Sequence, residues 1–269
     1  MAVERRTRIS VEVADRVATL TMDGAHVLNA LHSETHREMQ RAFDELDLRD
    51  DVGAVLVRGA GRAFCSGSDL REIGNIDGPT ARRYVQLDWI TKNRIAGSPK
   101  PVVAAIQGYC VGGGVELAVA CDIRIAASDA VFSMREVPLG SVPGSGGLQR
   151  LPSIVGRGVA KDWVLTGRDV PAEEALLRGL VSRLVAPVEL EHEARVLASS
   201  LAGRNATAMH LAKVALDPQP EPDRGLVATF QMLAGAACHT DPRYHETTSR
   251  FTGKQVAGES GTAGVPHAR

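Results

Sequence analysis

The chain has 269 residues, of which 44% are hydrophobic and 23% are charged, and its formal net charge at pH 7 is −1. This length allows one large domain or two smaller ones with a full core. The 31 Lys and Arg residues are scattered along the chain and balanced by 32 Asp and Glu residues, so nothing indicates a nucleic-acid-binding surface.

The cysteines and the apolar segments exclude further classes. Cys65, Cys110, Cys121 and Cys238 form no Cys-x-x-Cys pair and have no histidines at metal spacing, so we expect neither a zinc site nor a disulfide framework. The N-terminus lacks the apolar segment of a signal peptide, and no stretch of about 20 apolar residues is free of charge or repeated glycine. We therefore expect a cytoplasmic protein with reduced thiols, no metal and no membrane span.

The first third of the chain predicts a hairpin, a helix and a strand. Alternating residues over 9–22 surround an Ala-Asp turn and indicate a β-hairpin at a sheet edge. Ser33 is expected to cap an amphipathic helix over 34–48, because Met39, Phe43 and Leu46 recur at helical spacing. The short apolar run 53–61, closed by glycines, is typical of a strand buried on both faces.

Residues 80–152 predict a helix, further buried strands and a loop. A helix over 80–96 is expected to turn Tyr84, Leu87, Trp89 and Ile90 inward. Further strands are expected over 101–110 and, as two short strands around Ser128 and Asp129, over 122–134. A glycine- and proline-rich loop is expected to follow over 136–152.

The last third is predicted to be mainly helical. Helices are expected over 159–167, 171–179, 189–203 and 205–216, with a strand over 180–185. The small, polar residues at the end predict disorder. The expected division is a core domain with the active site over 1–190, a helical oligomerisation region over 191–254 and a disordered tail over 255–269.

Two segments share one pattern. Residues 55–70 and 102–117 each run from an apolar strand through a glycine turn into the start of a helix. This similarity favours a stacked, repeated strand-and-helix unit, with both glycine turns at carboxyl ends of strands, where ligands bind in parallel sheets.

The glycine turns could supply an oxyanion hole. Glycine lets backbone N–H groups approach a ligand closely, and at a helix start these groups are unpaired. "VGGGVELAVA" (111–120) fits such a helix start and "FCSGSDL" (64–70) fits a second donor turn, so one amide from each could hold a developing negative oxygen. Close packing of helix against strand explains the glycines equally well.

Two glutamates favour the catalytic interpretation. Glu116 is the only charge in an apolar, glycine-rich run, and it lies one helical turn after Gly113. A buried carboxylate needs partners or a proton. Glu136 lies between an apparent strand and the glycine-rich loop, and two converging carboxylates can divide into an acid and a base. The alternative for Glu136 is a solvated pair with Arg135.

Four segments resemble the successive motifs of the crotonase family, the enoyl-CoA hydratases and isomerases. They are "AFCSGSDL", "QGYCVGGGVELAVACDIRIA", "FSMREVPLGSVPGSGGLQRL" and "LTGRDVPAEEALLRGLVSRLV", in that family's order and spacing, within a similarity over residues 9–254. The resemblance implies an α/β fold, a spiral of ββα units with a C-terminal α-helical region, assembled as a homotrimer or a hexamer.

The resemblance also implies roles for individual residues. The oxyanion donors fall on the backbone N–H groups of Ser68 and Gly113, and the hydratase carboxylates fall on Glu116 and Glu136. With both acids present, hydration of a 2-enoyl-CoA is the implied reaction, with Glu116 as base towards water and Glu136 as acid towards the α carbon. No cofactor is implied beyond the coenzyme A that the acyl-CoA substrate carries.

The expected CoA site follows from the same resemblance. The loop 27–31 matches the family's loop near adenine and pantetheine, and Arg62 and Lys254 match basic positions, although both could be plain surface charge. The residues expected to bind the substrate or CoA are Leu28, Ala30, Arg62, Ala63, Ser66, Gly67, Asp69, Leu70, Gly112, Gly144, Phe251 and Lys254.

The sequence departs from the family's pattern at a few positions, and other functions are possible alternatives. Ser68 stands where alanine is common, Ser141 replaces a more usual aliphatic residue, and "FTGKQ" lacks the arginine that usually follows. These departures bear on the substrate more than on the reaction. The rivals are a Δ3-Δ2 enoyl-CoA isomerase, a catalytically idle scaffold, and a serine hydrolase using Ser145, for which the Gly-x-Ser-x-Gly motif is absent.

Overall fold

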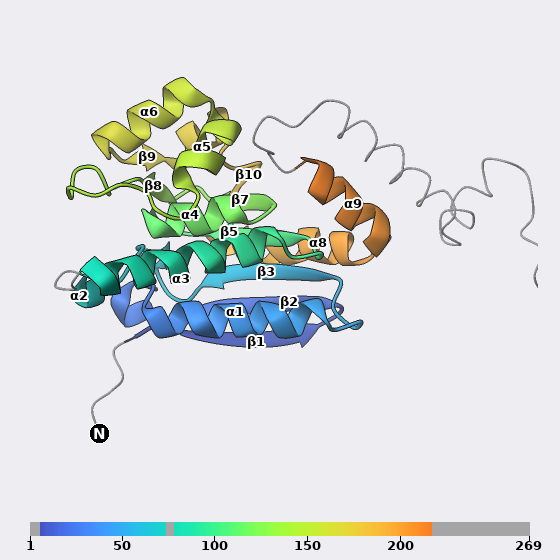
Figure 1. The fold of residues 1–269 in the computed structure, drawn as a ribbon. Helices are drawn as coiled ribbons and strands as arrows, with labels where there is room; N and C mark the ends of the chain where they lie inside the picture. The colour runs from blue at the N-terminus through green and yellow to red at the C-terminus, as the bar shows by residue number, and fades with distance from the viewer. Residues whose placement is uncertain (1–5, 74–77, 217–269) are drawn as a thin grey trace, which may run out of the picture. The chain divides into compact units, whose positions relative to one another are not determined.

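Two β-sheets built from alternating pieces of the chain form the framework (Figure 1). The computed structural model describes residues 6–73 and 78–216. The larger sheet has the strand order β1-β2-β3-β5-β7-β10, and the smaller one has the order β4-β6-β8-β9. The strands are β1 (Arg8–Ala14), β2 (Val17–Asp23), β3 (Ala54–Gly59), β4 (Ala63–Cys65), β5 (Val102–Ile106), β6 (Tyr109–Val111), β7 (Ile123–Ala127), β8 (Val131–Ser133), β9 (Val170–Pro171) and β10 (Arg183–Val185).

The predicted N-terminal hairpin is confirmed. Strands β1 and β2 pair antiparallel with Ala14 opposite Val17, so only Asp15 and Arg16 form the turn. Both turn residues have positive φ, 50° and 64°, as a tight two-residue hairpin turn requires. Strand β1 lies at the edge of the larger sheet, as expected.

The predicted repeat is also confirmed. In each repeat, one strand belongs to the larger sheet and the next strand belongs to the smaller one. Strands β3, β5 and β7 join the larger sheet, and the strand after each of them, β4, β6 and β8, joins the smaller one. A helix follows each pair. The strand predicted over 101–110 is therefore two strands, divided at Gly108, whose φ of +51° and closeness to the Arg62 carbonyl exclude a side chain.

The helices begin and end close to the predicted positions. They are α1 (Ser33–Asp47), α2 (Leu70–Ile73), α3 (Gly78–Ala96), α4 (Gly113–Ala120), α5 (Gly147–Val155), α6 (Arg157–Thr166), α7 (Ala172–Leu177), α8 (Leu190–Ala202) and α9 (Ala206–Leu216), with short 3-10 turns η1 (Ala25–Val27) and η2 (Pro187–Glu189). Helix α5 corrects the prediction of an open loop over 136–152. It begins at Gly147 and runs through Pro152, which lies inside the helix.

The cap predicted for α1 was wrong by one residue. His32, not Ser33, precedes the helix, and its Nδ1 accepts a hydrogen bond of 3.1 Å from the Glu34 amide. Ser33 is the first helical residue. The imidazole nitrogen takes the place of the hydroxyl oxygen that usually satisfies a free amide in the first turn.

The inward face of α3 also differs from the prediction. Tyr84 is buried as expected, but Trp89 and Ile90 are 38% and 45% exposed. The buried stripe instead continues through Asp88, Thr91, Lys92 and Ile95, which recur at helical spacing from Tyr84. Helix α3 lies beside α1 (Figure 1). The buried face of α3 therefore includes two charged side chains, those of Asp88 and Lys92.

The larger sheet separates two layers of core. Val55 and Val57 of β3 face a cluster that includes side chains of α1 and α4, whereas Ala54 and Leu56 face Ala194, Ala198 and other residues of α8. Burial on both faces explains the continuous apolar runs in β3 and β5.

The predicted division at residues 190/191 and 254/255 stays a prediction. The expected tail, Phe251 and Lys254 lie outside the residues that the structure describes. Among the helices described, none is long and apolar enough to span a membrane. Within residues 6–73 and 78–216, no group of His, Cys, Asp and Glu side chains is arranged to hold a metal ion.

Candidate active site

A cavity of about 600 Å³ lies where strands β4 and β6 end. Its lining includes the four residues predicted to be catalytic, Ser68, Gly113, Glu116 and Glu136. Five of the residues predicted to bind the substrate also line it: Ser66, Gly67, Leu70, Gly112 and Gly144. The two glycine turns and both acids, which are far apart in the sequence, therefore meet at one cavity.

The amides of Ser68 and Gly113 lie next to one another. A Cβ added to Gly113 would lie 3.4 Å from the Ser68 nitrogen, and one added to Gly67 would lie 3.1 Å from the Gly113 nitrogen. Within the described residues, neither amide donates a hydrogen bond to a backbone group of the surrounding loops. Gly113 also begins α4, so its amide lies at the positive end of the helix dipole.

Gly112 makes room for one of the acids. Its φ of 52° and ψ of −115° form a backbone conformation that residues with side chains rarely adopt. A Cβ at this position would lie 3.0 Å from Oε1 of Glu136. Glycine is therefore needed here both for the turn into α4 and for the space that the Glu136 carboxylate occupies.

Glu116 is buried, with 2% of its surface exposed, and has the partners that such a carboxylate requires. Its Oε1 accepts hydrogen bonds of 2.7 Å from the Ser145 amide and 3.0 Å from the Gly147 amide, at the start of α5. Its Oε2 lies 3.4 Å from Nζ of Lys92, which is fully buried. These contacts stabilise Glu116 as a carboxylate.

Asp88 links the partners of Glu116 to one another. Its Oδ1 accepts a 2.5 Å hydrogen bond from Lys92 Nζ, and its Oδ2 accepts one of 2.5 Å from the Ser145 hydroxyl. Glu116, Ser145, Asp88 and Lys92 thus form a closed ring of hydrogen bonds, which we call the polar ring. Burial alone would raise the pKa of Asp88, but the charge of Lys92 and the hydrogen bonds from Lys92 and Ser145 hold it below its usual range.

His36 of α1 contacts the polar ring through Asp88 and does not line the cavity. Its Nε2 is 3.4 Å from Oδ1 of Asp88, and its ring meets Tyr84 edge to face. Burial lowers the pKa of His36 to about 4, despite the opposing charge of Asp88. The imidazole is therefore neutral at physiological pH. Because the Ser145 hydroxyl donates to Asp88 and not to an imidazole, this arrangement does not favour a serine hydrolase.

Glu136 has a different environment from Glu116. Its Oε2 is buried and has no hydrogen-bond partner among the described residues. Burial, with the nearby charge of Glu116, raises the pKa of Glu136 to about 7. The alternative pairing with Arg135 is not observed, because Arg135 contacts Asp169 at 2.6 Å and the Ser133 hydroxyl at 3.1 Å. The cavity thus holds one carboxylate with hydrogen-bond and ionic partners and one acid whose pKa lies near neutral pH.

Several residues predicted to bind CoA do not line this cavity. The Leu28 carbonyl accepts a hydrogen bond from the Ser66 amide of the first donor turn, and Ala30 is buried. Asp69 is buried and pairs with Arg71 at 2.7 Å. Arg62 is exposed and Ala63 is buried in β4. Their CoA contacts stay predictions.

Apart from Glu116, the polar ring was not predicted from the sequence. Asp88 and Lys92 are four residues apart on α3. Their spacing from Tyr84 and Ile95 puts all four side chains on the same face of the helix, and this face is buried. This spacing could have indicated the buried pair, but the hydrophobicity of Trp89 and Ile90 led to the prediction that those two residues face inward.

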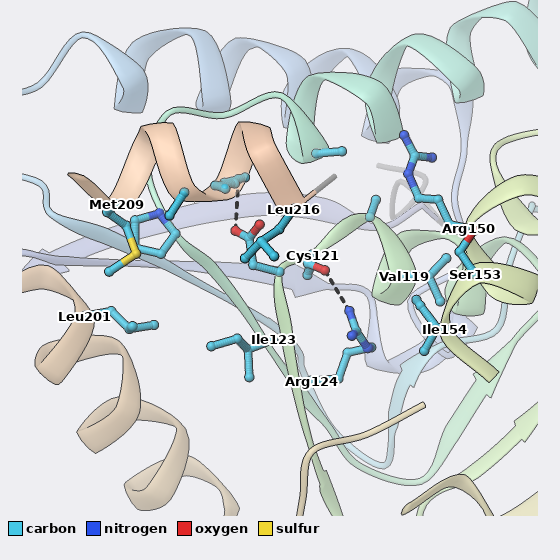
Figure 2. Close-up of a pocket in the computed structure, with 16 residues that line it drawn as sticks. Val119, Cys121, Ile123, Arg124, Arg150, Ser153, Ile154, Leu201, Met209 and Leu216 are labelled. Carbon is cyan, nitrogen blue, oxygen red and sulfur yellow. Dashed lines mark hydrogen bonds and ion pairs between the residues drawn. The ribbon is translucent and has the colours of Figure 1, made fainter. Parts of the chain in front are cut away.

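A second cavity, of about 470 Å³, shares no lining residue with the first (Figure 2). Its walls come from β7, α8 and α9 among other elements, and Ile123, Leu201 and Met209 give it an apolar character. Its polar groups are already engaged: Arg124 donates to the Cys121 carbonyl at 2.7 Å, and a buried lysine of α9 pairs with Asp122. None of the predicted catalytic residues faces it.

Comparisons with known proteins agree on one family. The family model described as enoyl-CoA hydratase/isomerase matches residues 12–254. A protein of Clostridium acetobutylicum named short-chain-enoyl-CoA hydratase is 35% identical over 92% of this chain and 95% of its own length. One of Syntrophomonas wolfei named crotonyl-CoA hydratase is 33% identical over 93% of this chain and 96% of its own.

Solved structures give the same result for the fold. The crystal structure of an enoyl-CoA hydratase from Bacillus anthracis superposes with a TM-score of 0.86 at 33% identity, covering 92% of this chain and 97% of that one. An enoyl-CoA hydratase structure from Streptomyces coelicolor, titled as putative, gives 0.87 at 30% identity over 95% of each chain. The α/β crotonase fold expected from the motifs is therefore confirmed.

Proposed function

This chain belongs to the enoyl-CoA hydratase/isomerase family, and we propose that it is an enoyl-CoA hydratase, which adds water reversibly to a trans-2-enoyl-CoA to give a 3-hydroxyacyl-CoA. The observation that carries the proposal is the pair of glutamates in contrasting environments on one cavity, beside two adjacent amides. Hydration needs both a base and an acid, and it needs a site for the negative charge that forms on the thioester oxygen.

The two amides would hold the thioester oxygen. In the proposed complex, the carbonyl oxygen accepts hydrogen bonds from the amides of Ser68 and Gly113 and carries the enolate charge as water adds to the β carbon. The dipole of α4 favours this negative charge. Such preorganised donors are among the larger contributions to catalysis.

The two acids would move the proton of the water. Glu116, held as a carboxylate, takes a proton from the water as its oxygen bonds to the β carbon. Glu136 is protonated below about pH 7 and gives its proton to the α carbon. Addition of H and OH across the double bond is then complete, and transfer of the proton from Glu116 to Glu136 through water restores both side chains for the next turnover. No step transfers electrons to or from the enzyme, so the proposal includes no cofactor beyond the coenzyme A of the substrate.

Assembly and location are further parts of the proposal. On the family resemblance we propose a homotrimer or a hexamer made of two trimers, acting in the cytoplasm on an acyl-CoA thioester. No nucleic acid or membrane partner is proposed, since the charge balance is nearly even.

A direct assay tests the function. Purified protein is mixed with trans-2-enoyl-CoAs of increasing chain length, starting with crotonyl-CoA, and loss of the conjugated thioester absorbance is followed. Glu116→Gln and Glu136→Gln should each lower kcat by about 10² to 10⁴, the usual range for a general acid or base. Glu191→Gln, which changes an exposed glutamate paired with Arg58, is the matched control and should behave as the unmodified protein.

The same assay separates the rivals. A scaffold protein would show no turnover with any chain length. An isomerase would form 2-enoyl product from a 3-enoyl-CoA faster than it hydrates the 2-enoyl form, and it would depend on one glutamate only. Hydration that survives both glutamine substitutions would refute the proposed mechanism.

A further inference from the structure

We propose that Lys92 is a positioning residue for Glu116, holding the carboxylate in place and in its charged form from behind the cavity wall. The inference rests on the proposed role of Glu116 as the base. Lys92 is fully buried and does not line the cavity, so it would act on the reaction only through the groups that it touches.

The polar ring gives each carboxylate oxygen of Glu116 a fixed place. Oε1 is held by the Ser145 and Gly147 amides, and Oε2 faces Lys92. Asp88 fixes both sides at once, because it accepts a hydrogen bond from Lys92 and another from the hydroxyl of Ser145. The loop that binds Oε1 and the ammonium that faces Oε2 are thus tied to one side chain. A closed ring of this kind leaves Glu116 little freedom to rotate.

Among the titratable groups named here around Glu116, Lys92 is the group that supplies positive charge. Helix α3 contributes Lys92 and Asp88, helix α1 contributes His36, strand β4 contributes Cys65, and Glu136 follows β8. Burial keeps His36 neutral and, by raising its pKa to about 12, keeps the Cys65 thiol protonated. Among these groups, Lys92 is therefore the one cation, and it faces two buried carboxylates.

If Lys92 is removed, the side chains of Asp88 and Glu116 become two neighbouring buried carboxylates, and none of the groups named above supplies a cation between them. Like charges in one buried volume favour protonation of one member of the pair. A protonated Glu116 cannot accept a proton from water. The inference therefore predicts an effect on the pH dependence of turnover, which a purely structural role of Lys92 would not produce.

The same chain provides a matched control. Lys213 is a second buried lysine, 9% exposed, and its Nζ pairs with Asp122 Oδ2 at 2.9 Å in the lining of the second cavity. Lys213→Met also removes a buried lysine from an ion pair, here with the partly exposed Asp122. Of the two lysines, only Lys92 is paired with Glu116.

The experiment measures hydration of crotonyl-CoA against pH. Lys92→Met should lower kcat by about 10- to 100-fold with KM within about twofold, and should move the acidic limb of the profile upward by about one pH unit. Adding Asp88→Asn to Lys92→Met removes the competing anion and should return the limb towards its original position. Lys213→Met should leave the limb in place, whatever its effect on thermal stability.

Each outcome decides the matter. An unshifted acidic limb in folded Lys92→Met would overturn the inference. If Lys92→Met does not fold, Ser145→Ala provides a second test, because it removes the hydroxyl that donates to Asp88 and so opens the polar ring. For this variant kcat should fall about fivefold with KM unchanged. An unaltered kcat would overturn the inference as well. Glu116→Gln, measured in parallel, separates the two proposals: if it retains full activity, the proposed base is wrong, whereas an inactive Glu116→Gln with an unshifted Lys92→Met refutes the role of Lys92 alone.

Discussion

The Ser145 amide donates a 2.7 Å hydrogen bond to Glu116 Oε1, joining the start of α5 to the first turn of α4. Glu136, on the same cavity, has a buried oxygen without a partner among the described residues. The two carboxylates have the same chemistry but opposite environments, and this contrast is the basis for the proposed roles of Glu116 as base and Glu136 as acid.

The first prediction concerns pH. Because burial raises the pKa of Glu136 to about 7, this side chain carries the proton needed for hydration below that pH and loses it above. We expect kcat/KM for crotonyl-CoA to fall as the pH rises through about 7. A pH profile measures this directly, and the residual activity of Glu136→Gln should lack the limb near 7. Persistence of that limb in Glu136→Gln would assign it to another group.

The second prediction tests the two amides. A Cβ added to Gly113 would meet its nearest neighbours at 3.4 to 3.5 Å, which is ordinary contact, so Gly113→Ala should fold. The methyl group would nevertheless fill the space beside the Ser68 amide, where the thioester oxygen is proposed to bind. We expect kcat/KM to fall by about 10² to 10³, the usual cost of losing an oxyanion contact.

The matched control for Gly113→Ala is Gly158→Ala. Gly158 lies in α6, and an added Cβ would meet nothing within 4 Å. This variant should have unchanged kinetics. Equal activity of the two alanine variants would show that the oxyanion does not bind at Gly113.

The third prediction concerns acid stability. His36 is neutral in the folded protein until about pH 4, whereas an unfolded histidine takes up a proton below about 6.5. Between these values the unfolded state binds more protons, so the contribution of His36 to stability falls as the pH drops from about 6.5 to about 4.

His36→Gln removes this titration. The free energy of unfolding of the unmodified protein, relative to His36→Gln, should decline by about 3 kcal/mol across that range, as measured by urea denaturation at several pH values. His192→Gln, at an exposed position on α8, should run parallel to the unmodified protein. A constant difference between His36→Gln and the unmodified protein would contradict the assignment.

Local sequence was sufficient to predict the features that single segments encode. The glycine turns around Gly67 and Gly113 carry their own geometry, and the alternation of strands and turns revealed the repeated unit. The polar ring could not be predicted in this way, because it joins Asp88 on α3 to Ser145, 57 residues away. Contacts of that kind exist only once the chain has folded, and hydrophobicity alone placed Trp89 inward where Asp88 and Lys92 are buried.

The final prediction assigns a structural role to the loop that the family resemblance connects with CoA. The side chain of Asn29 is fully buried and joins three segments: its Oδ1 accepts from the Gly24 amide at 2.9 Å, and its Nδ2 donates to the carbonyls of Ala60 and Ala63 at 2.9 and 2.8 Å. It also adopts a positive φ of 56°, which asparagine tolerates better than most residues.

Asn29→Ala would leave the buried Gly24 amide without this acceptor and would remove the Nδ2 donor from the Ala60 and Ala63 carbonyls, at a cost of about 1 to 3 kcal/mol for each buried group left unsatisfied. The donor turn is attached to this loop, since the Leu31 amide donates to the Gly67 carbonyl at 2.8 Å. We therefore expect a lower melting temperature together with a lower kcat. Asn29→Asp keeps the acceptor for the Gly24 amide but puts an oxygen beside the Ala60 and Ala63 carbonyls, so it should also lose stability, and more so above the pH at which the new carboxyl group ionises. Loss of CoA affinity without loss of stability would instead show that Asn29 acts as a ligand-binding residue.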